Sequence, residues 1–150
     1  MSKILVVSDS HGDLDLLDKI AQQHQDIDYY LHLGDSELPT YLIRPFIGVR
    51  GNCDYDYDYP LTRFIFVNNI KIYLEHGLSL SSKDDEYYLS KDCKIFLHGH
   101  THVHYVKKLK DMYIANPGSL TRPRDNSNGT YLIIDVKNED SISFNFYELD

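Results

Sequence analysis

Five short polar segments of this sequence carry side chains that could bind metal ions, and each directly follows an apolar run. They are SDSHG, LGD, RGNCD, EHG and HGHTH, and they contribute Asp9, His11, Asp35, Asn52, His76, His100 and His102. Imidazole, carboxylate and amide oxygen are suitable ligands for manganese, iron, nickel, cobalt and zinc. Seven ligands are too many for one such ion but suit two ions that share a carboxylate. Two metal ions roughly 3.5–4 Å apart can hold a hydroxide between them and clamp a phosphoryl oxygen for in-line attack.

The last of these segments lies in FLHGHTHVHY, residues 96–105, where four histidines occupy every second position. In an extended strand alternate side chains point to one side, so all four could converge. Gly99 indicates instead that the strand breaks into a turn. We therefore expect only some of the four to face the site, and we interpret His98 and His104 as strand residues on either side of the turn.

The elements that would position these segments begin with alternating strands and helices. The apolar spacing predicts strands at 3–8, 28–33 and 46–50, an amphipathic helix at 13–25 and a short irregular helix at 37–44. This β-α-β-α-β order predicts a parallel sheet with helices over its faces.

The rest of the chain changes to hairpins. We expect them at 63–77, 103–115 and 130–149, with a polar helix near 83–91 and a strand at 94–98. Asn68-Asn69 and Asn138 mark the turns of the first and last hairpin. Together these elements predict one α/β domain over residues 1–150, with two sheets packed face to face.

All five polar segments follow the end of an expected strand. Ligands of open α/β sheets bind beyond the carboxyl ends of the strands, so the segments are expected to meet at one rim. A glycine stands in or beside each segment and lets the chain turn sharply and approach an ion closely. Helix caps and turns are the alternative explanation for aspartate and asparagine at such junctions. Each motif alone is common, but the five in this order favour a metal site.

Composition narrows the class of protein. The chain has 150 residues and a net charge of −8, from 15 basic and 23 acidic side chains, and shows no basic stripe for gripping long nucleic acid. Its apolar runs are too short to cross a bilayer, and we expect no secretory leader because the first residues turn polar after four apolar ones. Cys53 and Cys93 form no CxxC pair, which suits a reducing compartment. We therefore expect a cytoplasmic protein that binds neither membrane nor long nucleic acid.

The series SDSHG, LGD, RGNCD, EHG and HGHTH, followed by NPGSLTRPR, resembles the calcineurin-like metallophosphoesterases, in particular the small YfcE-type phosphodiesterases. The resemblance extends from Lys3 to the strand at 130–136. It implies a single-domain α/β/β/α sandwich with a dinuclear centre of divalent ions, for which we expect manganese first, with nickel, iron, cobalt or zinc as alternatives.

The resemblance also implies how the ligands divide. One metal would take Asp9, His11, Asp35 and His102, and the other would take Asp35, Asn52, His76 and His100. Asp35 would bridge the two ions. His100 and His102 would then be the histidines of the alternating run that bind metal.

The chain departs from the family pattern at two places. Many of these enzymes have a histidine directly after the GN of the third motif, where it can protonate the leaving group. Here Cys53 stands in that place, as it often does in YfcE-type members. A neutral thiol is a poor proton donor, so the general acid is unassigned, and we expect good leaving groups to be favoured. Relatives also often have another histidine shortly after His76, where this chain has Leu78 and Leu80.

Further residues complete the expected site. The catalytic group is Asp35, Asn52, Cys53 and Asp54, with Asp54 able to orient Cys53 or a water. Arg122 and Arg124 are candidates for holding phosphate, because the planar guanidinium matches two phosphate oxygens. DYDYDYP, residues 54–60, is interpreted as an exposed loop, with Tyr55 or Tyr57 touching substrate as the alternative.

The function expected from these observations is a metal-dependent phosphodiesterase that uses a metal-bridging hydroxide for in-line attack on a small phosphate ester, with nucleotide-like esters among the candidate substrates. A phosphomonoesterase on the same scaffold is the first alternative. The second is a protein-interaction scaffold like the retromer subunit that shares this fold, although all seven ligand positions are filled here. The sequence leaves assembly into a homo-oligomer open.

Overall fold

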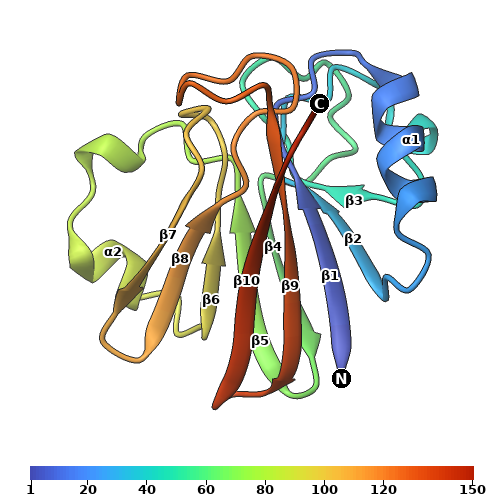
Figure 1. Ribbon diagram of the computed structural model, residues 1–150. Helices are drawn as coiled ribbons and strands as arrows, with labels where there is room; N and C mark the ends of the chain where they lie inside the picture. The colour runs from blue at the N-terminus through green and yellow to red at the C-terminus, as the bar shows by residue number, and fades with distance from the viewer.

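The computed structural model describes residues 1–150 as two five-stranded mixed sheets with a helix on each outer side (Figure 1). The first sheet has the order β10-β9-β1-β2-β3, with bounds Ser141–Glu148, Thr130–Asn138, Ser2–Val7, Tyr29–His32 and Ile47–Gly48. The second has the order β4-β5-β6-β8-β7, with bounds Thr62–Val67, Ile70–Glu75, Ile95–Leu97, Met112–Asn116 and Tyr105–Leu109. The helices are α1 (Leu14–Gln23) and α2 (Asp85–Leu89), with short 3₁₀ turns η1 (Thr40–Leu42) and η2 (Leu80–Ser82).

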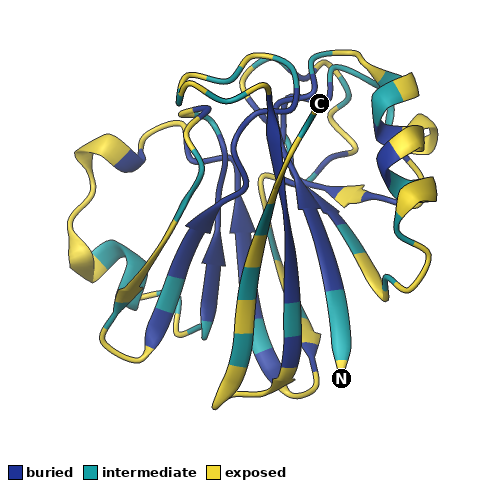
Figure 2. Cartoon of the chain, viewed as in Figure 1, coloured by how far each residue is buried: buried dark blue, intermediate teal, exposed yellow.

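The alternation of β1 shows how the sequence builds four layers. Ile4 and Val6 belong to a cluster of 15 buried residues that both sheets supply, so this cluster fills the space between them. Leu5 and Val7 point the other way, into a second cluster with Leu17 of α1. A third cluster, on the outer face of the second sheet, is covered by the aromatic side chains of α2. Figure 2 shows the buried strands between outer helices whose far faces are exposed. The α/β/β/α order is therefore confirmed.

The hairpins are confirmed and the small elements are shorter than expected. β4 and β5 pair up to the turn at Asn68-Asn69, whose φ angles of 50° and 65° suit a tight hairpin turn. The helix expected over residues 37–44 is only the turn η1, because Pro39 and Pro45 flank it. None of the helices combines the length and apolarity that crossing a bilayer requires.

The rim that carries the polar segments is built by both sheets. β1 runs parallel to β2, and β5 runs parallel to β6, so the carboxyl ends of each pair lie together at the upper end of Figure 1. The amide of Gly99, after β6, donates to the carbonyl of His76, after β5. The amide of His100 donates across the sheets to Asp9 Oδ2 at 3.1 Å. The strand ends of two sheets, rather than of one, therefore surround the candidate site.

Candidate metal centre

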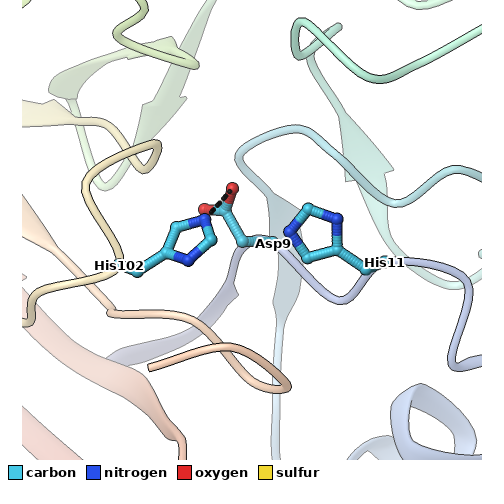
Figure 3. A group of neighbouring side chains, drawn as sticks. All are labelled: Asp9, His11 and His102. Carbon is cyan, nitrogen blue, oxygen red and sulfur yellow. Dashed lines mark ion pairs between the residues drawn. The ribbon is translucent and has the colours of Figure 1, made fainter. Parts of the chain in front are cut away.

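Two groups of side chains at this rim have ligand atoms within 4.8 Å of one another. One comprises Asp9, His11 and His102, and Figure 3 shows the two imidazoles on either side of the Asp9 carboxylate. The other comprises Asp9, Asp35 and His76. Five of the seven ligands expected from the sequence therefore lie in two adjoining groups, and Asp9 is the member common to both.

Asp9 is fully buried and has one oxygen held by the protein and one free. Its Oδ2 accepts hydrogen bonds from the Ser8 hydroxyl at 2.5 Å and the His100 amide at 3.1 Å. Its Oδ1 has no hydrogen-bond partner and lies 3.2 Å from His102 Nε2 and 3.8 Å from His76 Nε2. Burial opposes ionisation, but the two imidazoles and the Ser8 hydroxyl outweigh it and lower the pKa of Asp9. Asp9 is thus an ionised carboxylate with one oxygen available to a cation.

Asp35 has a similar arrangement. Its Oδ1 accepts the Cys53 amide at 2.8 Å, and its Oδ2 lies 3.2 Å from His76 Nε2. Burial would raise the pKa of Asp35, but the His76 imidazole and the Cys53 amide lower it to about 2. The backbone amide of Asp35 donates to Asp54 Oδ2 at 2.9 Å, which fixes the loop that presents the carboxylate.

Each of the three histidines in these groups has its Nδ1 atom bound by a protein oxygen. The acceptors are Glu37 Oε1 for His11 (2.9 Å), the Leu33 carbonyl for His76 (2.7 Å) and the Arg122 carbonyl for His102 (2.6 Å). Because these oxygens can only accept, Nδ1 carries the proton. When such a ring is neutral, its lone pair is on Nε2, the nitrogen that belongs to the ligand groups. Such outer hydrogen bonds orient metal-binding histidines in proteins.

Unpartnered atoms indicate what the groups can hold. Within them, Asp9 Oδ1, His11 Nε2 and His76 Nε2 are buried and have no hydrogen-bond partner. Buried polar atoms are nearly always hydrogen-bonded, and each one left unpaired costs about 1–3 kcal/mol. Asp9 Oδ1 belongs to both groups, His11 Nε2 to the first and His76 Nε2 to the second, so each group has a carboxylate oxygen and an imidazole nitrogen of the kind that borderline divalent cations bind. The residues therefore fit a metal ion.

The charges at the site also favour a cation. Burial lowers the pKa of His76, but Asp35 and Asp9 outweigh burial and raise it. Contact with Asp9 raises the pKa of His102 against a smaller opposing effect of burial. Both shifts arise because the two buried carboxylates stabilise positive charge at the site. A metal ion bound there would take the place of the proton on the imidazole.

The backbone at the site is unusual. Asp9, His11, Asp35, His100 and His102 all have positive φ, between 46° and 74°. This left-handed region is uncommon for residues other than glycine and costs of order 1–3 kcal/mol per residue. Strain of this kind concentrates at functional sites.

Glycines permit the loops to approach one another. A Cβ at Gly34 would lie 2.5 Å from His76 Nδ1, and one at Gly99 would lie 2.8 Å from Asp9 Oδ2. A Cβ at Gly51 would overlap Asp35 Oδ1. The glycines expected to allow close approach to ions are thus in contact with the ligands themselves.

Two of the expected ligands lie outside the two groups. Asn52 is exposed, and its Nδ2 lies 3.5 Å from Cys53 Sγ. His100 is partly buried, with its ring centre 5.1 Å from that of His76. Burial and the charge of His76 lower the pKa of His100, so its ring is neutral. Both residues stand at the edge of the second group, and their roles as ligands stay predictions, as does the bridging role of Asp35.

Cys53 and Asp54 have different environments. Burial, followed by the charges of Asp35 and Glu37, raises the pKa of the Cys53 thiol, which makes it a weaker acid. Asp54 is buried and accepts the backbone amides of Asp35, Glu37 and Gly51 at 2.7–2.9 Å. All its hydrogen bonds go to backbone, so Asp54 holds the loops after β2 and β3 together and does not hydrogen-bond to Cys53.

The remaining expected contacts lie at the surface. Arg122 and Arg124 have exposed side chains, and their backbones hold His102: the Arg122 carbonyl accepts from Nδ1, and the Arg124 amide donates to the His102 carbonyl at 2.9 Å. Tyr55 and Tyr57 are 88% and 79% exposed, which agrees with the interpretation of DYDYDYP as an exposed loop.

Several supporting residues were missed from the sequence. Glu37, which binds His11, carries no motif signal beyond its place two residues after Asp35. The hydroxyls of Ser119 and Thr121 donate to the Asp9 carbonyl at 2.8 and 3.3 Å. These two lie in NPGSLTRPR, so the segment supports the strained backbone of Asp9. Of the alternating histidines, His98 is bound to Tyr105 and His104 to Asp125. Both lie one residue outside the strands in which they were expected, because β6 ends at Leu97 and β7 begins at Tyr105.

Comparison with known sequences gives one family and curated relatives in it. The calcineurin-like phosphoesterase superfamily domain matches residues 2–139. A probable metallophosphoesterase of Bacillus subtilis, YsnB, is 31% identical over 153 residues, covering 97% of this chain and 90% of the relative. The phosphodiesterase YfcE of Escherichia coli is 22% identical over 164 residues, covering 90% and 88%.

Solved structures share the fold. A conserved protein of Streptococcus pneumoniae described as a predicted phosphoesterase superposes with a TM-score of 0.88 and 27% identity, covering 98% of this chain and 89% of that one. Vps29 of Chaetomium thermophilum superposes with a TM-score of 0.80 and 22% identity, covering 99% and 88%. At that identity the second likeness shows the fold alone.

Proposed function

This chain belongs to the calcineurin-like phosphoesterase superfamily, and on that basis we propose that it is a metal-dependent phosphodiesterase acting on small phosphate esters. The observation that carries the proposal is the set of buried atoms without hydrogen-bond partners, Asp9 Oδ1, His11 Nε2 and His76 Nε2. A carboxylate oxygen and imidazole nitrogens are donors that a borderline divalent cation binds. The phosphodiesterase name of YfcE supports diesters over monoesters as substrates.

The site residues divide the work in this proposal. His11, His102 and Asp9 would hold one divalent ion, and His76, with Asn52 and His100 at the edge, would hold a second. Asp35 would bridge the two ions. When bound, two such ions supply Lewis acidity and a nucleophile at neutral pH for in-line hydrolysis. Manganese is the first ion to test, with nickel, iron, cobalt and zinc after it.

The proposed site has no strong proton donor for the leaving group. Cys53 occupies the place next to Asn52, and its raised pKa makes the thiol a poor donor to an alkoxide. No imidazole of the two metal groups is free to replace it, because each donates its Nδ1 proton to a fixed oxygen. We therefore propose that substrates whose leaving group departs without protonation, such as aryl or activated esters, are hydrolysed fastest.

The test is hydrolysis of bis(para-nitrophenyl) phosphate and of the matching monoester, with manganese and after chelation. Asp35→Asn should lower diester turnover by at least about a hundredfold, more than the loss of an outer hydrogen bond to a ligand typically costs. Asp18→Asn, the same change on the exposed face of α1, is the matched control and should leave turnover unchanged.

The outcomes separate the candidate functions. Diester turnover that needs metal and Asp35 supports the proposal. Faster turnover of the monoester would move the assignment to a phosphomonoesterase. No turnover by folded, metal-loaded protein with any of the five metals would overturn the enzyme proposal in favour of an interaction scaffold.

A further inference from the structure

A cavity of about 310 Å³ opens beside the candidate metal centre. His76 and Asn52 form its boundary with the metal site, and Arg50, Leu61, Glu75 and Leu78 lie around it. Its volume is at the lower end of the range of small-molecule sites, which is enough for one ring. A group bound there would be attached directly to a phosphoryl group at the metal centre.

Glu75 is a buried carboxylate at the side of this cavity. The residue is only 9% exposed, although it immediately precedes His76. Its Oε1 accepts hydrogen bonds from the Tyr73 hydroxyl at 2.9 Å and from the Tyr87 hydroxyl. No protein group donates to Oε2, which stays accessible to solvent, and no lysine, arginine or histidine forms an ion pair with the side chain. A side chain more than nine-tenths buried thus keeps one strong acceptor without a protein partner, on a residue that lines the cavity.

The other walls define what could meet that acceptor. Leu61 and Leu78 are 61% and 60% exposed, so the cavity has apolar side chains at its mouth. Arg50 also lines it, with its guanidinium carbon 4.7 Å from the centre of the Tyr57 ring. The guanidinium disfavours a cationic ligand in the same space. The complement of these walls is a neutral group with apolar faces and a hydroxyl that donates to Glu75.

We infer that this cavity binds the organic group of the substrate and that Glu75 selects a ring bearing a hydroxyl, as in a sugar or ribosyl phosphodiester. The inference rests on the proposed phosphodiesterase function and names its substrate class. A ligand that lacks the hydroxyl would displace solvent from Oε2 without replacing its hydrogen bond, so the cavity is expected to discriminate between the two ligands. A hydrogen bond to a charged acceptor corresponds to about a ten- to hundredfold preference.

The test compares two substrates with the same leaving group, the para-nitrophenyl esters of uridine monophosphate and of its dideoxyuridine analogue. The wild-type enzyme should show a kcat/KM about ten- to a hundredfold higher for the ribosyl ester. In Glu75→Gln the one amide oxygen is needed to accept the two tyrosine hydroxyls, which leaves an NH2 donor in place of Oε2. The variant should therefore reduce that ratio to within about threefold of unity while retaining bound metal. Glu86→Gln, the same change at an exposed position of α2, is the matched control and should keep the wild-type ratio.

A second variant tests the cavity without replacing the buried Glu75, because replacing a buried residue could unfold the protein. Leu78→Trp changes an exposed residue and would partly fill the cavity, so it should raise KM for the ribosyl ester more than for methyl para-nitrophenyl phosphate. Binding of uridine monophosphate and its dideoxy analogue, measured by calorimetry, reports the same preference without turnover.

The failures of the two proposals are distinguishable. Turnover of bis(para-nitrophenyl) phosphate without a ribosyl preference would overturn the inference about the cavity and leave the phosphodiesterase intact. Absence of all turnover, with a Glu75-dependent preference in binding, would overturn the enzyme and retain the cavity. An unchanged ratio in Glu75→Gln would show that Glu75 only holds the two tyrosines.

Discussion

Glu37 offers a sharp test of how the metal centre is held. Its Oε1 lies 2.9 Å from His11 Nδ1 and fixes which nitrogen of His11 carries the proton. We expect Glu37→Ala to free the ring to rotate and to change tautomer, which weakens metal binding without removing a ligand. Loss of such an outer partner costs 10- to 100-fold in metal affinity in other proteins.

The structure places the expected effect at the lower part of that range. The Glu37 side chain is 29% exposed, so water weakens its interaction with His11 and can partly replace it in the variant. We expect an affinity about ten- to thirtyfold lower for one of the two metals, equivalent to about 1.4–2 kcal/mol. The Glu37 amide still donates to Asp54 in the variant, so the loop should keep its conformation.

The assay is titration of metal-free protein with manganese by calorimetry, with competition by a chelator. Glu37→Gln keeps an acceptor oxygen and should recover part of the affinity. Glu139→Ala, at the exposed turn after β9, is the control for loss of a surface carboxylate. Unchanged affinity for both metals in Glu37→Ala, with the fold intact, would refute the proposal that this hydrogen bond prepares His11.

Three further predictions concern stability and catalysis. Burial lowers the pKa of His32 to about 4, whereas in the unfolded chain it is near 6.5. Below pH 6.5 the unfolded state therefore takes up the proton first, and the contribution of His32 to the unfolding free energy of metal-free protein should fall by roughly 3 kcal/mol by pH 4. Urea unfolding should show a correspondingly smaller fall in stability for His32→Gln than for the wild type. Cys53→His should supply a proton donor, so rates should depend less on the pKa of the leaving group across a series of aryl and alkyl diesters, and an unchanged slope would contradict this. Gly99→Ala would place a Cβ 2.8 Å from Asp9 Oδ2, so both Tm and manganese affinity should fall, whereas wild-type values for both would refute the close-approach argument.

Local patterns in the sequence predicted two sheets packed face to face, whereas the full α/β/β/α order was implied by the family resemblance. In β1, Ile4 and Val6 lie between the sheets, and Leu5 and Val7 lie under α1. Because both faces of the strand are buried, its sequence is a continuous apolar run. The turn at Asn68-Asn69 is likewise a local signal. What alternation cannot specify is which sheet each strand joins, so a rim built from the ends of two sheets emerges only in three dimensions.

The candidate site was predictable as a set of residue types but not as an arrangement. Motif order identified the aspartates and histidines that meet at the rim, since aspartate and histidine at strand ends are recognisable in one dimension. Whether Asp9 or Asp35 is shared by the two groups depends on which oxygen of each carboxylate accepts hydrogen bonds from the protein and which is left free. Asp9 is the shared member because the His100 amide and Ser8 hydroxyl hold Oδ2 and leave Oδ1 free between His76 and His102.

The atoms that prepare the histidines are the least predictable part, and their identity explains why. His76 and His102 are oriented by the carbonyl oxygens of Leu33 and Arg122. Every residue has a backbone carbonyl, so replacing Leu33 or Arg122 would leave the acceptor in place. The residue type at these positions therefore gives no sign of the hydrogen bond. What such contacts require is the path of the chain, and the positive φ at Asp35 and His102 shows that this path is strained. Side chains that hold other ligands, such as Glu37 and Ser119, are replaceable only at a cost, and they are therefore the positions at which substitution can reveal how the site is built.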